Sequence, residues 1–266
     1  MKDEIEIPKN HPRAESLRVR ERLINCFESG AVARAGLIAQ GRGEAFDYLI
    51  GEKTLKSATI ALRAAAATIL LAKNPVISVN GNVAALVPED IVNLAKITQM
   101  RIEVNLFYRF KGRDESIKKI LEDAGAKEIL GIGEAASATI PELLSERRRV
   151  DPRGILIADV VLVPLEDGDR TEALRRMGKN VIAIDLNPLS RTAQLASITI
   201  VDNVLRALPL LIKESKDLKR LSSERLQKIV AEYDNIKILK EAINSIRFRL
   251  EKLAEVGLIK DLEVSE

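Results

Sequence analysis

The sequence predicts an α/β protein with a mostly parallel sheet, an N-terminal helical layer and a C-terminal helical tail. From residue 76 onward, short runs rich in β-branched residues alternate with helix-forming stretches, the order that places crossover helices between parallel strands. Over residues 14–72, and again beyond residue 217, apolar residues recur at helical spacing. The central part is therefore predicted to be a Rossmann-like, doubly wound core.

The central part contains short apolar runs that we expect to be strands, with helices in the stretches between them. The expected strands are 76–79 (VISV), 102–107 (IEVNLF), 128–132 (EILGI), 160–163 (VVLV), 181–184 (VIAI) and 198–201 (ITIV), and the expected helices are 88–98, 113–124, 168–177 and 203–215.

The two flanking segments are predicted to be helical for different reasons. In the N-terminal segment, glycines are expected to break the helical run into pieces; they are Gly30, Gly36, Gly41, Gly43 and Gly51. In the tail, apolar residues from 236 to 253 alternate three and four residues apart, which predicts one long helix or a helical hairpin. That stripe would pack either on the protein's own surface or against another subunit. The expected organisation is a helical segment packed on the core (1–75), a nucleotide-binding core (76–215) and a helical extension (216–266).

Composition excludes several classes of protein. No membrane segment is expected, because apolar stretches such as 58–72 are shorter than the roughly 18 to 20 residues that span a bilayer. The N-terminus lacks the apolar core of a secretory signal, so a cytoplasmic location is expected. A net charge of +3, the absence of Trp and 3% aromatic residues argue against a nucleic-acid partner.

The same composition limits metal and redox chemistry. With one Cys and one His, Cys26 and His11, the chain can form neither an internal disulfide nor a Cys/His metal cluster. Any divalent metal would be a hard, oxygen-ligated ion such as Mg²⁺. The abundance of Glu, Lys, Arg and Ile, with few aromatic residues, is typical of heat-adapted proteins and predicts a thermophilic source.

Polar side chains follow most of the expected strands at their carboxyl ends, where ligands bind in open parallel sheets. They are Asn80, Gly81 and Asn82 after the first strand, Asn105 within the second, Glu166, Asp167, Asp169 and Arg170 after the fourth, Asp185, Asn187 and Arg191 after the fifth, and Asp202 and Asn203 after the last. Each loop alone could be an ordinary turn or helix cap. Several such loops at one sheet edge favour a binding site.

The residue types at this edge indicate a nucleotide and a small polar molecule. Asp185 lies where an acidic residue meets a ribose hydroxyl in Rossmann-like folds, and Arg191 is close enough in sequence to reach phosphate. The acidic residues 166–169 could hold Mg²⁺ or an amine, or could form a solvated turn whose Asp169 caps the next helix. The amides of Asn80 and Asn82 suit a polar small molecule.

Two glycine-bearing motifs have alternative interpretations. Gly41-Arg42-Gly43 could present a guanidinium to phosphate oxygens or could be a simple turn. Residues 131–136 fit the dinucleotide pattern G-x-G-x-x-A, although Pro141 would shorten the crossover helix; this is the basis of a rival interpretation as an NAD-dependent oxidoreductase. No P-loop pattern is present. A third interpretation is a nucleotide-sensing scaffold that acts through its helical tail.

Several longer blocks resemble one family. They are HPR at 11–13, GLIAQGRGEAFDYLIGEKT at 36–54, VISVNGNVAALVP at 76–88, IEVNLFYR at 102–109, ADVVLVPLEDGDRTEAL at 158–174, VIAIDLNPLSRTA at 181–193 and ITIVDN at 198–203. In combination they are similar to archaeal phosphopantothenate synthetase over most of residues 11–210. The stretch 134–152, with its run of three arginines, and the tail beyond 210 resemble the family less. Gln40 stands where a His often occurs, so no catalytic histidine is expected there.

The resemblance implies an activity and a set of partners. It implies a homodimeric, Rossmann-like ligase that uses ATP to join 4-phosphopantoate to β-alanine, giving 4'-phosphopantothenate for coenzyme A. The reaction would pass through an acyl-adenylate and release AMP and pyrophosphate. The residues that would bind ATP are Arg20, Arg42, Asp185, Leu186, Asn187, Arg191, Thr192, Asn203 and Val204.

The remaining polar residues are candidates for the other two substrates. Asn80, Gly81, Asn82 and Asn105 are expected to bind phosphopantoate, and Glu166 or Asp167 the ammonium group of β-alanine. Arg20, Arg42 and Arg191, with Mg²⁺, are expected to neutralise the triphosphate. No single catalytic residue and no metal ligand is assigned.

Overall fold

A parallel sheet forms the centre of the computed structural model, which describes residues 8, 10–11, 13–141 and 143–256. Parts of the expected first and last segments, residues 1–7, 9, 12 and 257–266, lie outside these. Within the described residues the sheet has five strands in the order β2-β1-β5-β6-β7, and every neighbouring pair is parallel. The strands are β1 (Pro75–Val79), β2 (Arg101–Val104), β5 (Val160–Pro164), β6 (Asn180–Ile184) and β7 (Ile198–Ile200). The predicted α/β class with a mostly parallel sheet is confirmed.

The strand order contains a switch point between β1 and β5. From β1 the chain continues outward to β2, whereas from β5 it continues in the opposite direction to β6 and β7. At such a point the crossover loops diverge and leave a crevice outside the carboxyl ends of the two central strands.

One expected strand is wrong and another is shorter than expected. The run 128–132 contributes a single bridge, between Glu103 and Leu130, rather than a strand. Gly131 and Gly133 have φ angles of 77° and 53°, which turn the chain away from the extended conformation. β2 ends at Val104, three residues before the end of the expected run.

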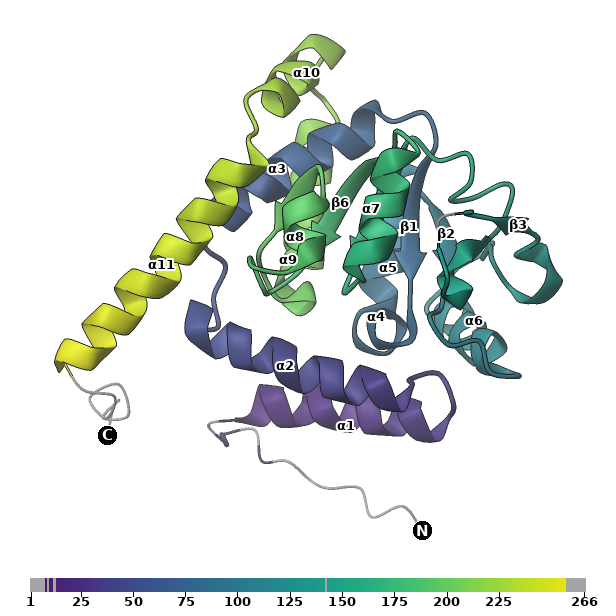
Figure 1. Ribbon diagram of the computed structural model, residues 1–266, viewed down its shortest axis with the longest axis horizontal. Helices are drawn as coiled ribbons and strands as arrows, with labels where there is room; N and C mark the ends of the chain where they lie inside the picture. Colours follow the sequence, from purple (N-terminus) through teal and green to yellow (C-terminus); the bar gives the residue numbers. More distant parts are fainter. Residues whose placement is uncertain (1–7, 9, 12, 142, 257–266) are drawn as a thin grey trace.

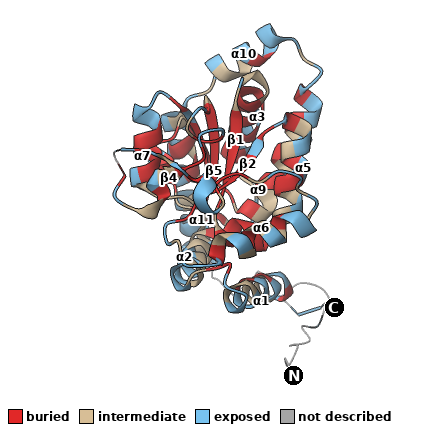
Figure 2. Cartoon of the chain, turned by 90° about the vertical axis from the view of Figure 1, so that its right-hand side faces the viewer, coloured by how far each residue is buried: buried red, intermediate tan, exposed pale blue. Residues whose placement is uncertain are grey.

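Helices cover both faces of the sheet, and the strands alternate between them with period two. In β5, Val160 and Leu162 pack into one apolar cluster while Val161 and Val163 pack into the other. The first face is covered by α3 (Lys56–Leu71), α5 (Pro88–Thr98) and α9 (Val204–Leu218), and the second by α7 (Gly168–Arg176). Figure 2 shows the strands buried between these layers.

Shorter elements complete the core. They are α4 (Gly81–Leu86), α6 (Arg113–Asp123), α8 (Arg191–Leu195), the helical turns η1 (Gly133–Ala135) and η2 (Glu146–Arg148), and the antiparallel pair β3 (Ala138–Thr139) and β4 (Arg149–Val150). None of the helices in the described part of the chain is both long and apolar enough to cross a membrane.

The N-terminal layer consists of α1 (Ala14–Glu28) and α2 (Arg34–Ile50). The two helices lie side by side below the carboxyl ends of the strands (Figure 1). Gly30 and Gly51, with φ angles of 85° and 90°, follow the ends of α1 and α2 as expected. The expectation that Gly36, Gly41 and Gly43 also break the helix is wrong, because all three lie inside α2.

The tail contains two helices, α10 (Ser223–Ala231) and α11 (Asn235–Val256). Both contact α3, and α11 also reaches α2, so part of the apolar stripe packs on the protein's own surface. We call the resulting third apolar group the tail cluster. It consists of the buried residues Ile50, Leu186, Ala193, Val201, Leu239 and Ala242. It joins the end of α2, the loops after β6 and β7, and α11.

Candidate functional site

The carboxyl ends of the strands and one side of α2 enclose a cavity of about 260 Å³. Each strand contributes a loop to this edge, and α2 lies across it (Figure 1). The lining residues are Ala33, Ala35, Gly36, Ala39, Gln40, Arg42, Gly43, Asn80, Gly81, Asn82, Leu106, Phe107, Tyr108, Arg113, Arg147, Leu165, Asp167, Leu186, Asn203 and Val204. The cavity therefore lies at the switch point, where a parallel sheet binds ligands.

Many of the residues chosen from the sequence line this cavity. They are Arg42, Asn80, Gly81, Asn82, Asp167, Leu186, Asn203 and Val204. The other choices are not among its lining residues: Arg20, Asn105, Glu166, Asp185, Asn187, Arg191 and Thr192. Most of these support the residues that do line it.

Gly36 lets α2 approach the start of α4 closely. A Cβ atom on Gly36 would lie 2.1 Å from Oδ1 of Asn82, and one on Gly43 would lie 3.6 Å from Leu186. The amide of Asn82 donates to the carbonyl of Gly36 at 2.8 Å, so α2 is bonded to the start of α4. A helix that needs bare backbone on its packed side contains glycine without breaking.

Asn80 connects the two central strands at the switch point. Its side-chain oxygen accepts from the backbone N–H of Val83, so it is the N-cap of α4. Its amide donates to the carbonyls of Pro164 and Leu165 at 3.2 and 3.0 Å. The loops after β1 and β5 are therefore held together at the floor of the cavity.

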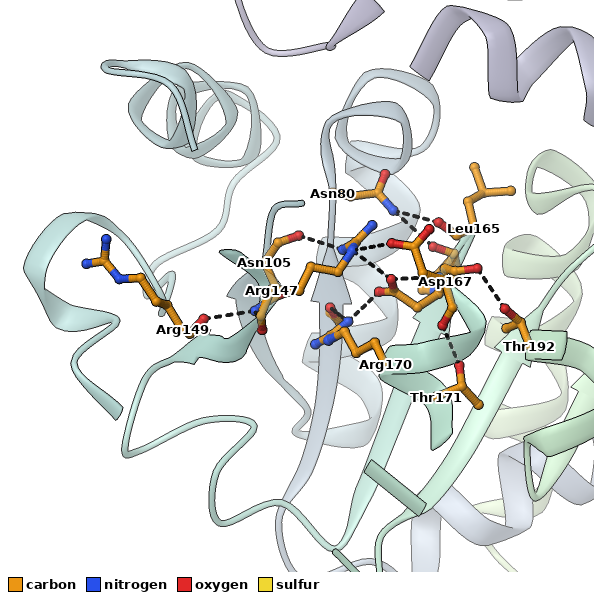
Figure 3. A network of polar contacts seen from close by, with 12 residues as sticks. Asn80, Asn105, Arg147, Arg149, Leu165, Asp167, Arg170, Thr171 and Thr192 are labelled. Carbon is orange, nitrogen blue, oxygen red and sulfur yellow. Dashed lines mark hydrogen bonds and ion pairs between the residues drawn. The ribbon is translucent and has the colours of Figure 1, made fainter. Parts of the chain in front are cut away.

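A buried ionic network lies beside the cavity, under the loop after β5 (Figure 3). Glu166, whose side chain is 1% exposed, pairs with Arg170 and with Arg147. Arg147 also pairs with Asp167 at 2.7 Å, and Arg170 donates to the hydroxyl of Ser78. Glu166 is thus engaged by two guanidinium groups, whereas Asp167 remains at the cavity wall.

Asn105 holds the segment that carries Arg147. Its side-chain amide donates to the backbone carbonyls of Arg147 and Arg149 at 3.1 and 3.0 Å, and its backbone carbonyl accepts from Nη1 of Arg147 at 3.1 Å. Asn105 is completely buried. It therefore positions the 147–149 segment.

The loop after β6 is ordered by Asp185. Its carboxylate accepts from the hydroxyl of Ser190 and from the backbone N–H of Asn187. Burial raises the pKa of Asp185, and these hydrogen bonds together with the charge of Arg42 act in the opposite direction. Arg42 and Asp185 therefore interact across the boundary between α2 and the sheet.

Thr192 and Arg191 occupy the start of α8. The buried Thr192 hydroxyl donates to the carbonyl of Glu166 at 2.8 Å, which connects the loops after β5 and β6. Arg191 is exposed and pairs with Glu172 at 2.8 Å.

Asn203 fastens α2 to the loop after β7. Its side-chain oxygen caps α9 through the N–H of Leu205, while its amide donates to Asp47 of α2 at 2.8 Å. Arg206 bridges Asp47 and Asp202. A smaller hollow shares Gln40 and Asn203 with the cavity and is also lined by Glu44.

Arg20 lies beside that smaller hollow rather than in the cavity. Its guanidinium binds both carboxylate oxygens of Glu44, at 2.9 and 3.0 Å. This pair connects α1 to α2.

Comparison with known proteins gives a single family. The phosphopantothenate/pantothenate synthetase model matches residues 57–249, which is most of the chain. The chain belongs to this family. The resemblance predicted from the short blocks is confirmed.

Several curated family members are similar over nearly their whole length, and all three described here carry the name "4-phosphopantoate--beta-alanine ligase". The protein of Thermococcus kodakarensis is 55% identical over 261 residues, covering 98% of this chain and 99% of the relative. That of Methanosarcina mazei is 54% identical over 249 residues, with 94% and 97% covered. That of Methanospirillum hungatei is 44% identical over 244 residues, with 92% and 98% covered.

The rival dinucleotide fingerprint does not form a phosphate site in this family member. Residues 133–135 make only a short helical turn, followed by β3, so no crossover helix begins at Gly131-Ile132-Gly133. The backbone amide of Gly133 is bonded to Asp114.

Sequence reasoning missed two charged residues of the cavity lining, Arg113 and Arg147. Both are buried, with 8% and 6% of their surface exposed. Arg147 lies in the run Arg147-Arg148-Arg149, where residues 148 and 149 are more exposed. No periodicity distinguishes a buried arginine from its exposed neighbours, so no signal in the sequence identified it.

Proposed function

We propose that this chain is an ATP-dependent ligase that condenses 4-phosphopantoate with β-alanine to give 4'-phosphopantothenate for coenzyme A synthesis. The observation that carries the proposal is the continuous cavity along the carboxyl ends of the sheet, with a charged lining at each end. Its family membership and the shared name of its relatives support the same activity.

The strand order supports a division of the cavity between two substrates. Neighbouring strands lie about 4.8 Å apart, so the loops after β2 and β6 are separated by roughly 14 Å. The two substrates would bind from opposite sides and meet between these loops. We assign ATP to the side of β6 and β7, and phosphopantoate to the side of β1 and β2.

The residues of the ATP side have separate tasks in this proposal. Arg42 neutralises phosphate charge from α2, and Asp185 orders the loop that presents Leu186. Asn203 and Val204 close the end of the site at the start of α9. Arg20, Asn187, Arg191 and Thr192 belong to the surrounding ATP region through the contacts described above.

The chemistry requires activation of a carboxylate. A carboxylate oxygen of phosphopantoate attacks the α-phosphorus of ATP, the bond to the β-phosphate oxygen breaks, and pyrophosphate leaves. The amine of β-alanine then attacks the acyl carbon, AMP leaves with its oxygen, and the nitrogen loses a proton. The protein's contribution is to hold the reacting atoms together and to neutralise charge.

Asp167 is our candidate for binding the ammonium group of β-alanine. It is the carboxylate among the described cavity residues, and it follows β5, between the two substrate sides. Asn80, Gly81, Asn82 and Asn105 belong to the phosphopantoate side, where Asn105 acts through Arg147. Glu166 would act through the same arginine.

Mg²⁺ would enter this site on the phosphates of ATP. Among the described residues no group of three or more Cys, His, Asp or Glu side chains is arranged to hold a metal. This fits an ion that keeps most of its waters and binds mainly through the phosphates of the substrate. Such an ion spreads the charge of the leaving pyrophosphate.

The test is a reaction with ATP, 4-phosphopantoate and β-alanine, followed by mass detection of the products. We expect 4'-phosphopantothenate and AMP in equal amounts. ADP in place of AMP would contradict the adenylate route and keep the ligase assignment. Absence of phosphopantothenate would refute the assignment itself.

The proposal also includes a homodimer, which light scattering of the same preparation tests. It places the reaction in the cytoplasm, with small-molecule partners only.

A further inference from the structure

Two buried arginines, Arg113 and Arg147, meet at the end of the cavity that lies farthest from the ATP side. Arg113 begins α6, after β2, and Arg147 comes from η2. Both line the cavity, although each is more than nine-tenths buried. Burying a guanidinium is costly unless its N–H groups are satisfied.

Each guanidinium is held by protein acceptors through two of its three nitrogens. Arg113 donates from Nε to the carbonyl of Ala31 at 3.0 Å and from Nη1 to the carbonyl of Tyr108 at 2.6 Å. Arg147 donates from Nε to Asp167 at 2.7 Å and from Nη1 to the carbonyl of Asn105 at 3.1 Å. Both side chains are therefore fixed in position before any ligand binds.

The third nitrogen, Nη2, is available in both arginines. Within the described part of the chain, neither Nη2 has a hydrogen-bond partner, and neither is sealed from the cavity. Figure 3 shows that one nitrogen of Arg147 points away from the dashed contacts, toward Asn80. For Arg113, a side chain at Gly81 would come within 3.0 Å of Nη2, so the glycine leaves this atom open to the cavity.

The two positive charges also repel each other. Burial and the nearby charge of Arg147 lower the pKa of Arg113 to about 10. Arg147 pairs with Glu166 and Asp167, and Arg170 pairs with Glu166. Arg113, in contrast, is bonded to backbone carbonyls and to no carboxylate in the part of the chain that the structure describes. A bound dianion would offset the repulsion and satisfy both free N–H groups.

We propose that Arg113 and Arg147 form a clamp for a phosphate monoester, and that this monoester is the 4-phosphate of phosphopantoate rather than a phosphate of ATP. This assignment rests on the proposed function. It makes the two arginines specificity-determining residues, because unphosphorylated pantoate would leave two buried N–H groups without acceptors. The choice of source follows from the sheet order, which places α6 at the β2 edge and the ATP loops after β6 and β7.

The decisive measurement is the ratio of kcat/KM for 4-phosphopantoate to kcat/KM for pantoate. In Arg113→Gln and Arg147→Gln we expect this ratio to fall roughly 10- to 100-fold, because a charge-assisted hydrogen bond to the phosphate is lost. The KM for ATP should stay unchanged.

The matched control is Arg109→Gln, since the Arg109 side chain is similarly buried, binds the carbonyl of Gly131 and does not line the cavity. Its ratio should stay at the wild-type value. Thermal unfolding of all three variants verifies that they fold, and Arg113→Lys and Arg147→Lys replace any that do not.

Other outcomes would overturn the clamp. An equal loss of activity toward both acids would show that the arginines are merely structural. A rise in the KM for ATP alone would assign them to the nucleotide. Inorganic phosphate provides a test on the unaltered protein: it should compete with 4-phosphopantoate and not with ATP, and competition with ATP alone would contradict the proposal.

Binding measurements separate this inference from the proposed function. If the wild-type protein makes no phosphopantothenate, the proposed function fails. Calorimetry would then still show tighter binding of 4-phosphopantoate than of pantoate, and loss of that difference in Arg113→Gln, if the clamp exists. Equal binding of the two acids by the wild-type protein would refute the clamp.

Discussion

Arg42 and Asp185 are charged side chains on opposite sides of the boundary between α2 and the nucleotide side of the cavity. Arg42 lines the cavity, and its charge opposes the effect of burial on the carboxyl group of Asp185. Asp185 in turn orders the loop through Asn187 and Ser190. Because the two residues lie on different elements, their substitution should give different kinetic results.

The Arg42→Ala substitution should lower kcat/KM for ATP by on the order of 100-fold. A guanidinium on phosphate oxygens in a water-poor site contributes several kcal/mol to the transition state. Lys119→Ala is the control, because Lys119 is exposed on α6 and the substitution removes the same charge. Steady-state kinetics on both variants measures the effect, and similar small losses would show that Arg42 does not contact phosphate.

The Asp185→Asn substitution should raise chiefly the KM for ATP, by an amount corresponding to about 1 to 3 kcal/mol. Asp185 orders the loop that holds the nucleotide, and such support contributes equally in the ground and transition states, so its loss affects KM more than kcat. Measuring both constants over a range of Mg²⁺ concentrations distinguishes this role from metal ligation. A loss of kcat that excess Mg²⁺ restores would assign Asp185 to the metal instead.

Glu103 should make the stability of the protein depend on pH. It is completely buried and accepts from the backbone N–H groups of Asp151 and Ile155. Burial raises its pKa to about 7 from an ordinary value of 4.5. The folded state thus holds the proton more tightly, and stability is lost as pH rises from about 4.5 to about 7.

This ionisation should remove on the order of 3 kcal/mol of unfolding free energy across that pH window. Glu103→Gln cannot ionise, so its unfolding free energy should change less between pH 5 and 7 than that of the wild type. Denaturant titrations at several pH values measure how the unfolding free energy of each protein depends on pH. The same pH dependence in the variant and the wild type would show that Glu103 keeps an ordinary pKa.

At the scale of single elements, α2 explains why helix boundaries were only partly predictable. Its helical character and its end were recognised, since Gly51 follows it with a positive φ angle. Its interior was misjudged, because intrinsic propensity disfavours glycine while the close contact of Gly36 with Asn82 requires it. Propensity is a local property, and the neighbour that overrides it lies 46 residues away.

Two glycines of α2 provide a matched test of this explanation. Gly36→Ala should weaken both stability and turnover, because the new methyl group would lie 2.1 Å from the Asn82 amide oxygen. Gly41→Ala should stabilise the protein by about 1 kcal/mol, since nothing lies within 4 Å of the added carbon and alanine favours the helix. Thermal unfolding and assays of both variants measure the contrast. Equal effects would mean that α2 does not pack on α4 as described.

For the whole molecule, the sequence predicted several residues that line the candidate cavity, and it did not predict how they are arranged. The alternation of strands and helices was sufficient for the fold class, and loops after the strands were sufficient to choose Asn80, Asp167 and Asn203. The strand order was not predictable, since it depends on pairings between distant segments. For that reason the switch point, and the burial of Arg147 beside it, emerged only in three dimensions.

The tail cluster implies reciprocal coupling between the C-terminal helix and the nucleotide. Leu186 lines the cavity and also packs with Ile50 of α2 and Leu239 of α11. A ligand that stabilises this arrangement must also stabilise the packing of α11, and loosening that packing must weaken ligand binding by the same factor.

Leu239→Ala should therefore reduce ATP affinity by on the order of 5-fold in calorimetry, whereas Leu250→Ala, at a more exposed position of α11, should not. Equal affinities in the two variants would show that the tail is energetically independent of the site. With coupling, a helix that touches no substrate would be an allosteric element, and changes in its sequence would adjust nucleotide affinity without altering the residues that contact ATP.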